Sequence, residues 1–304
     1  MNDLPSVSVV IPAHKRPVEL RRAIASVREQ DYAGPIDVVV VYDRAEPDLT
    51  LADDGNRPIL VLTNTRTPGL AGARNTGILA STGALVAFCD DDDVWFAGKL
   101  TKQVTRLSAY PDAPMVTTSI VVDYGDRSTV RLAGTDLVTR ETLLGSRMSM
   151  LHSSTFVFRR NALEGELGLI NEEIPGSQKE DWDILLRSSA LFPVVHVDEP
   201  LVRVLWGKSS YFSRRWDTKV DASIWMLETY PDVAAHRSGS ARIKGQIAFA
   251  LASDGKRREA WRWAGRSLKG DPLQWRAWLA CGVAVVPRSS ELVLGTLHRW
   301  GRGV

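Results

Sequence analysis

Four successive aspartates, directly after an apolar run, constrain the fold of this chain more than any other feature. Residues 84–87 (Ala-Leu-Val-Ala) predict a buried β-strand, and the aspartates occupy positions 90–93. Carboxylates inside a sheet would lose too much hydration energy unless a cation joined them. We therefore expect them at the C-terminal end of the strand, where α/β sheets bind their ligands.

The spacing of these aspartates favours a metal site. Alternate side chains of an extended segment point the same way, so Asp90 and Asp92 can face one ion. Oxygen ligands suit Mg²⁺, Mn²⁺ or Ca²⁺ and not zinc, and the EF-hand spacing is absent. A solvated acidic turn is the other interpretation. The strand before the run and Val94 and Trp95 after it favour a metal or ligand site instead.

Strands and helices alternate in the first third of the chain, which is typical of an α/β sheet that binds nucleotides. Apolar runs and helical periodicity predict strands at 7–11, 36–41 and 59–62 and helices at 17–30, up to 81, and at 98–107. Further strands are expected at 115–122, 129–132, 153–159, 194–197 and 201–205, with a helix that starts near 179.

Residues 68–77 are rich in glycine and lead into the second of these helices. They match neither G-x-G-x-x-G nor the P-loop. A tight turn before a helix is one interpretation. Arg74 favours an anion site as the other, because backbone N–H groups at a helix start and a guanidinium can share an anion.

The composition, with 44% hydrophobic and 24% charged residues among 304, is that of an ordinary globular protein. Cys89 and Cys281 lie far apart and form no disulfide or zinc pattern, which fits a reducing cytoplasm. Residues 1–5 lack the regions of a signal peptide, and no apolar run approaches the roughly 20 residues that span a bilayer. We expect a cytoplasmic protein without a nucleic-acid partner.

Charge is distributed unevenly along the chain. Segment 238–304 has 12 Lys and Arg against 4 Asp and Glu, a net charge of +8, and the remainder carries −6. Beyond about Pro231 we expect helices packed on the main domain; a basic surface that contacts anionic lipid is the alternative. The predicted amphipathic stripe comprises Trp275, Trp278, Leu279, Gly282, Val283 and Val286.

Four blocks together resemble the family-2 glycosyltransferases, an inverting group with the GT-A fold. They are V-S-V-V-I-P-A-H-K-R-P at 7–17, A-G-A-R-N-T-G at 71–77, F-C-D-D-D-D-V-W at 88–95 and K-E-D-W-D at 179–183. The resemblance covers roughly residues 7–210. It implies an α/β fold, a Rossmann-like mixed sheet flanked by helices, in a domain at 1–230. A helical, basic C-terminal region at 231–304 would follow.

The resemblance also implies a reaction, the transfer of a sugar from a nucleotide-diphosphate sugar, with UDP favoured, to an acceptor hydroxyl with inversion. Mn²⁺ or Mg²⁺, held by Asp92 and Asp90, would neutralise the leaving diphosphate. Asp181 would accept the proton of the hydroxyl, and Glu180 and Trp182 would bind the acceptor. The nucleotide-binding residues that the resemblance implies are Pro12, His14, Arg16, Asp43, Arg74, Asp90 and Asp91.

Bacterial members of the family commonly build cell-surface polysaccharides or glycolipids at the cytoplasmic membrane. The implied partners are therefore a nucleotide-sugar donor and a carbohydrate or lipid-linked acceptor. The basic segment 238–304 adds a peripheral contact with the inner face of that membrane. The sequence identifies neither the sugar nor the acceptor nor the linkage.

Two positions depart from the family pattern. The second strand normally ends in two aspartates, but Tyr42 stands at the first and only Asp43 remains. A further metal-ligating His is often found in the segment that is 201–210 here, where Leu205 or Trp206 stands. His152 and His196 lie elsewhere and are interpreted as ordinary polar residues.

The missing His leaves open a non-catalytic protein that binds nucleotide sugars or acts as a scaffold. A sugar-nucleotide pyrophosphorylase is a third hypothesis, because it would share the sheet topology. That enzyme requires a G-x-G-x-R loop after the first strand, and residues 12–17 contain none.

Overall fold

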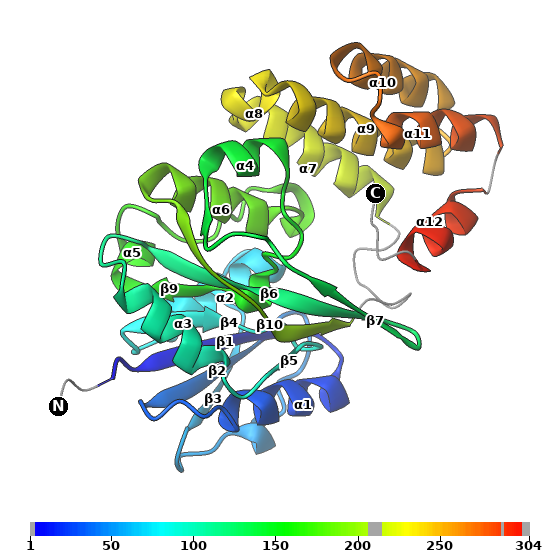
Figure 1. Cartoon of the computed structure of the whole chain (residues 1–304). Coiled ribbons are helices and arrows are strands. Elements are labelled where there is room, and N and C mark those ends of the chain that lie inside the picture. The colour runs from blue at the N-terminus through cyan, green and yellow to red at the C-terminus, as the bar shows by residue number, and fades with distance from the viewer. Residues whose placement is uncertain (1–3, 206–214, 287–288, 300–304) are drawn as a thin grey trace.

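A computed structural model describes residues 4–205, 215–286 and 289–299. In this part of the chain, ten strands form one mixed sheet that helices flank, and a further group of helices follows at the C-terminus (Figure 1). The strands are β1 (Val7–Ala13), β2 (Ile36–Tyr42), β3 (Ile59–Thr63), β4 (Leu85–Phe88), β5 (Val94–Trp95), β6 (Met115–Tyr124), β7 (Arg127–Arg131), β8 (Leu137–Val138), β9 (Val157–Arg159) and β10 (Val194–Leu205).

The helices around the sheet come from the first two thirds of the chain. They are α1 (Pro17–Arg28), α2 (Leu70–Ala80), α3 (Lys99–Ser108), α4 (Arg140–Gly145), α5 (Arg160–Glu164) and α6 (Glu180–Leu191), with short 3₁₀ turns η1 (Leu49–Leu51), η2 (Ser153–Thr155) and η3 (Pro175–Ser177). The C-terminal helices are α7 (Trp216–Thr229), α8 (Pro231–Ala235), α9 (Arg237–Ser253), α10 (Arg257–Gly270), α11 (Trp275–Val285) and α12 (Ser290–Arg299).

The N-terminal half of the sheet is parallel and covered on both faces. The strand order is β3-β2-β1-β4-β9-β6-β10-β5, and β1 pairs in parallel with both β2 and β4. Successive residues of β1 alternate between two cores: Val9 packs with α1 and α3, and Val10 packs with α2 and α6. A strand buried on both faces must be apolar throughout, which explains the β-branched runs.

The C-terminal half of the sheet departs from two predictions. The strands expected at 194–197 and 201–205 form a single strand, β10, whose pairing with β6 shifts register around Pro200. Proline has no N–H to donate to a neighbouring strand, so a register shift accommodates it without ending the strand. The strand expected at 153–159 is shorter, because residues 153–155 form η2 and only β9 is extended.

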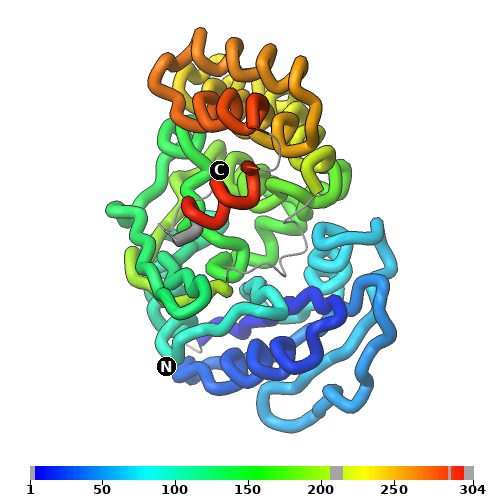
Figure 2. The backbone as a smooth tube through the Cα atoms, turned by 90° about the vertical axis from the view of Figure 1, so that its right-hand side faces the viewer, coloured from blue at the N-terminus to red at the C-terminus, as the bar shows by residue number. Residues whose placement is uncertain are grey.

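The C-terminal helices pack on the main domain, as expected, with α7 against η3 and with α8 and α9 against α4. Figure 2 shows α8 to α11 gathered at the end opposite β1 to β3. Helix α9 packs against α7, α10 and α11. The predicted boundary at 230/231 falls between α7 and α8, and the division into two domains stays a prediction. None of the helices in the described ranges combines the length and apolar character needed to cross a bilayer.

The predicted apolar stripe of α11 forms only part of its packing face: Val283 is buried and Leu279 packs against the core. Trp278 and Val286 are 58% and 57% exposed. Small residues complete the packing face, with Ala277 and Ala280 fully buried. The helices approach closely because Gly245 of α9 has no Cβ, which would lie 3.3 Å from the backbone nitrogen of Ala277.

Candidate active site

A cavity of about 1250 Å³ opens at the carboxyl ends of the parallel strands. The segments that follow β1, β2 and β4 contribute His14, Asp43 and the aspartates 90–93 to its wall. The opposite wall comes from the start of α6 and from the C-terminal helices. The sequence analysis placed the aspartates at the end of their strand, and this position is confirmed. All the predicted site residues line the cavity except Arg74, which lies behind its surface.

One wall of the cavity is acidic and is tied to the loop after β1. Arg16 forms ion pairs with Asp91 at 2.9 Å and Asp92 at 2.7 Å. The backbone N–H of His14 donates to Asp91 at 2.9 Å. Burial, and next the charge of Asp93, raise the pKa of Asp92 to about 7. Such a crowded set of carboxylates favours a bound cation.

Asp43 holds the glycine-rich loop in place. Its carboxylate accepts hydrogen bonds from the Asn64 side chain at 2.8 Å and from the Gly69 N–H at 3.1 Å. The predicted contact between Asp43 and the nucleotide base stays a prediction, and Asp43 does line the cavity. Tyr42, at the position of the first family aspartate, is buried.

Arg74 links the two walls of the cavity. Its side chain is 1% exposed, and it pairs with Asp90 at 2.7 Å and with Glu180. Burial alone would lower the pKa of Arg74, but the two carboxylates outweigh burial and raise it. Both ends of the guanidinium are therefore occupied by carboxylates. The predicted nucleotide-binding role of Arg74 stays a prediction, and its contacts place it behind Asp90 in the described structure.

The structure also indicates a set of metal ligands that the sequence analysis did not assemble. Ligand atoms of Asp90, Asp93 and His152 lie within 4.8 Å of one another. His152 Nδ1 lies 3.3 Å from Asp93 Oδ2, and this carboxylate raises the pKa of His152 to about 9 although burial opposes it. Two carboxylates and an imidazole fit a divalent ion such as Mn²⁺.

The predicted ligands Asp92 and Asp90 therefore divide between two roles in the described structure. Asp90 belongs to the set with His152, and Asp92 faces Arg16. His152, interpreted from the sequence as an ordinary polar residue, lines the cavity beside the aspartates. His196 matches that interpretation: it is fully buried and bonds to Thr117 and Ser119. Positions 206–210, part of the segment where the family His is often found, lie outside the described residues.

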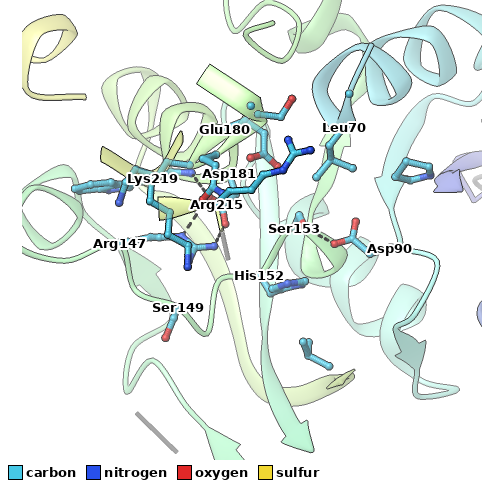
Figure 3. Close-up of a pocket in the computed structure, with 18 of the residues that line it drawn as sticks. Leu70, Asp90, Arg147, Ser149, His152, Ser153, Glu180, Asp181, Arg215 and Lys219 are labelled. Atoms are coloured by element: carbon cyan, nitrogen blue, oxygen red, sulfur yellow. Dashed lines mark hydrogen bonds and ion pairs between the residues drawn. The ribbon is translucent and has the colours of Figure 1, made fainter. Parts of the chain in front are cut away.

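Asp181 stands at the other wall, in the first turn of α6. Its side chain is 7% exposed and pairs with Arg147, which also donates Nε–H at 3.2 Å. Burial raises the pKa of Asp181, but Arg147 outweighs burial and the net shift is downward. Burial instead dominates for Glu180 and raises its pKa to about 7 despite Arg74. Figure 3 shows Arg147 and Asp181 on one side of the pocket and Asp90 with Ser153 on the other.

The backbone before α6 is strained where it aims these carboxylates. Gly176, Ser177 and Lys179 have φ of 61°, 54° and 71°, in the left-handed region. Non-glycine residues adopt this region at a cost of roughly 1 to 3 kcal/mol, and such strain is common at functional sites. The Ser177 hydroxyl accepts from the Ala71 N–H at 3.2 Å, which joins this turn to the glycine-rich loop.

Trp182 lies deeper than the predicted stacking role would require. Its side chain belongs to the core at 3% exposure, and its indole N–H donates to the Leu143 carbonyl at 3.0 Å. Its role in acceptor binding stays a prediction, but little ring surface is free for a sugar. The described contacts are those of a core residue that anchors the start of α6.

The sequence analysis missed a group of cations that line the cavity, several of them near Asp181. They include Arg131, Arg147, Lys179, Lys219 and Arg242. They come from β7, the segment after α4, the turn before α6, α7 and α9. No local spacing signal joins residues so distant in sequence, and only the folding of the chain brings them together.

Comparisons with known proteins agree with this geometry. The family model "Glycosyl transferase family 2" matches residues 8–166. The amylovoran biosynthesis glycosyltransferase AmsB of Erwinia amylovora is 30% identical over 217 residues, which is 66% of this chain and 69% of that protein. WfgD of Escherichia coli, a UDP-Glc:alpha-D-GlcNAc-diphosphoundecaprenol beta-1,3-glucosyltransferase, is 34% identical over 104 residues, 33% of this chain and 40% of WfgD.

A solved structure shows the same fold. The mannosyltransferase PcManGT from Pyrobaculum calidifontis, in complex with GDP-Man and Mn²⁺, superposes with a TM-score of 0.58 at 20% identity, covering 96% of this chain and 84% of that one. The predicted fold class, a GT-A-like mixed sheet with a helical C-terminal region, is confirmed. With the family model spanning more than half of its residues, the chain belongs to glycosyl transferase family 2.

Proposed function

We propose that this chain is an inverting glycosyltransferase that moves a sugar from a UDP-sugar to a hydroxyl of a lipid-linked or polysaccharide acceptor. One observation carries the proposal. A single cavity holds the carboxylates and His152 on one wall and Asp181 on the other. Displacement with inversion needs these two walls, because the leaving group and the attacking hydroxyl lie on opposite faces of the sugar carbon.

The residues of the first wall would hold the donor. Asp90, Asp93 and His152, with Asp92 close by, are suited to a Mn²⁺ or Mg²⁺ ion. When bound, the ion supplies positive charge that stabilises the departing diphosphate. Asp43 and the His14 loop border the same part of the cavity and would hold the nucleoside.

The residues of the second wall would prepare the acceptor. Asp181 would accept the proton of the attacking hydroxyl, a contribution of roughly 10²- to 10⁴-fold to the rate. In the described structure the Asp181 carboxylate is paired with Arg147. The acceptor must therefore share or displace this pair before the carboxylate can act as a base. Glu180 stays paired with Arg74 and would position the wall.

The choice of UDP and of the acceptor class rests on the relatives. The name of WfgD states a UDP-Glc donor and a diphosphoundecaprenol acceptor, and AmsB belongs to the synthesis of a polysaccharide. We propose in addition that the chain works in the cytoplasm and contacts the inner membrane face through its C-terminal helices. Exposed apolar side chains there include Leu273 at 87% and Leu292 at 76%, within a segment of net charge +8.

A non-catalytic nucleotide-sugar binding protein is the second candidate. The observation that favours it is the occupied carboxylate of Asp181, because a base held by an arginine accepts protons weakly. Turnover separates the two candidates. A binding protein would bind UDP tightly and neither transfer nor hydrolyse the sugar, whereas the enzyme would do both in the presence of Mn²⁺ or Mg²⁺.

The experiment begins with thermal shift of the chain against a panel of nucleotide sugars, because a bound donor stabilises the native state. With the donor so identified, Asp181→Asn should lower transfer by about 10²- to 10⁴-fold and leave the Kd for UDP within about twofold. Asp217→Asn, at an exposed site in the first turn of α7, is the matched control. Full turnover by Asp181→Asn would show that another residue acts as the base.

A further inference from the structure

The acceptor wall concentrates positive charge. We call Arg131, Arg147, Lys179, Lys219 and Arg242 the basic cluster. Figure 3 shows Arg147 and Lys219 beside Asp181, with Arg215 at the same place. The loop and helices that bring these residues together converge on the pocket from both the sheet domain and the C-terminal helices.

The members of the basic cluster are close enough to repel one another. Burial, and then the charge of Arg147, lower the pKa of both Arg131 and Arg242. Burial, and next Arg147, lower the pKa of Lys179 to about 7. Like charges gathered in a partly buried wall destabilise the protein unless an anion joins them.

Several contacts of the cluster are with neutral side chains. Arg131 donates to Ser149 Oγ at 3.0 Å, and Arg242 donates to Ser146 Oγ at 2.7 Å. Lys179 Nζ lies 3.3 Å from the Gln246 side-chain oxygen. The neutral partners of Lys179 and Arg242 orient these two cations without cancelling their charge. Asp181 contacts the cluster through Arg147.

The position of the cluster assigns it to the acceptor and not to the donor. Inversion requires the base on the face of the sugar opposite the leaving diphosphate. Arg147 touches the proposed base, so the cluster lies on the attacking side. The donor diphosphate belongs with the aspartates of the other wall, beyond Arg74, where a metal ion is needed to compensate negative charge.

We propose that the basic cluster binds a phosphate or diphosphate group of the acceptor, and that this anion competes with Asp181 for Arg147. The idea rests on the proposed function and adds the chemical class of the acceptor. Guanidinium groups bind phosphate oxygens in pairs of hydrogen bonds, and Arg147 has enough donors to turn from a carboxylate to a phosphate. Release of Asp181 would then follow acceptor binding, so the base becomes available only when a hydroxyl is in place.

The test is isothermal titration with two probes, inorganic phosphate and farnesyl phosphate, on protein saturated with UDP and Mg²⁺ so that the donor wall is filled. We expect both probes to bind the wild-type protein. Arg242→Gln and Arg131→Gln should each weaken phosphate binding about tenfold or more, because each variant loses charge-assisted hydrogen bonds to the phosphate. The Kd for UDP should change less than about twofold.

Lys244→Gln is the matched control, because Lys244 lies on α9 two positions from Arg242 and does not line the cavity. It should leave phosphate binding unchanged. The two substituted arginines lie on different elements. If one variant folds poorly, as a lowered Tm would show, phosphate binding by the other variant still tests the proposal. Tighter binding of farnesyl phosphate than of inorganic phosphate identifies a lipid-linked acceptor. Equal binding identifies a soluble phosphorylated glycan.

Two results would overturn the inference. If phosphate does not bind in the presence of UDP, or if the arginine variants do not weaken its binding, the cluster is not an anion site. If the variants instead weaken UDP by the same factor, the cluster serves the donor. Failure of the proposed function has a separate signature: no nucleotide sugar would stabilise the protein, and UDP binding would not depend on Mg²⁺.

Discussion

At the scale of single residues, His152 distinguishes two possible metal sites. The sequence analysis predicted Asp92 and Asp90 as ligands, whereas the described side chains group Asp90 and Asp93 with His152. We expect His152→Gln and Asp93→Asn each to weaken Mn²⁺-dependent UDP binding by about 10- to 100-fold, the range seen when a residue of a metal site is lost. Asp92→Asn should have a smaller effect. Calorimetric titration of UDP with and without Mn²⁺ measures this, and the reverse order would restore Asp92 as the main ligand.

His196 predicts how stability depends on pH. The imidazole is fully buried against Thr117 and Ser119, and burial lowers its pKa from 6.5 to about 4 although Asp198 opposes the shift. The unfolded chain therefore binds a proton between these pH values that the native state does not. The contribution of neutral His196 to the free energy of unfolding is complete above pH 6.5. As the pH falls to 4, this contribution decreases by about 3 kcal/mol.

The measurement is the urea midpoint of wild type and His196→Gln between pH 7 and 4. The variant should be less stable at pH 7, because it loses contacts in the core, and its midpoint should fall less steeply with acid. Parallel curves for the two proteins would show that His196 does not titrate in this range.

At the scale of elements, α2 depends on the absence of a side chain at Gly72. A Cβ there would overlap the carbonyl oxygen of Thr67, in the loop that Asp43 holds. Gly72→Ala should lower stability by roughly 1 to 3 kcal/mol and should weaken UDP binding, because it displaces the glycine-rich loop. Gly265→Ala in α10 is the control, since no atom lies within 4 Å of its Cβ. Thermal unfolding should show the control unchanged or slightly more stable; an equally tolerant Gly72 would mean that the loop can shift.

Elements also show what the sequence can and cannot predict. The strands β1 to β4 lie within one or two residues of their predicted positions, because strands buried on both faces are continuous apolar runs with β-branched residues. The face of α11 was predicted only in part, because helical periodicity reports which residues are apolar and not which neighbour they meet. Val283 is buried together with small alanines, whereas Trp278 stays exposed. The aspartates and Asp181 stand in short local motifs and could be found. His152 and the basic cluster depend on contacts between distant segments and could not.

At the scale of the whole molecule, the proposed membrane contact of the C-terminal helices can be tested on their exposed apolar side chains. Leu273 is 87% exposed, and the nearby Trp278 is held by a hydrogen bond of its indole N–H to the Pro272 carbonyl at 2.9 Å. We expect the protein to sediment with vesicles that contain anionic lipid and to be released by high salt. Leu273→Asp should lower the bound fraction several-fold, because it removes apolar burial and adds a repelled charge.

Val18→Asp is the control for that experiment. Val18 is 67% exposed but lies on α1, at the end of the molecule away from the C-terminal helices. Its replacement should leave sedimentation as in the wild type. If both substitutions lower the vesicle-bound fraction equally, or if neither lowers it, the C-terminal helices do not form the membrane contact.

Arg74 has a consequence for how such an enzyme can diversify. One planar guanidinium, buried at 1% exposure, pairs with Asp90 of the proposed donor wall and with Glu180 of the proposed acceptor wall. Arg74 therefore sets the distance between the two walls, and rotation of the side chains cannot increase it. A lysine would keep the positive charge but would bind the two carboxylates less rigidly, because it lacks the planar guanidinium and its fixed arrangement of donors. Variants that accept bulkier sugars should arise from changes in the surrounding loops, with this arginine retained.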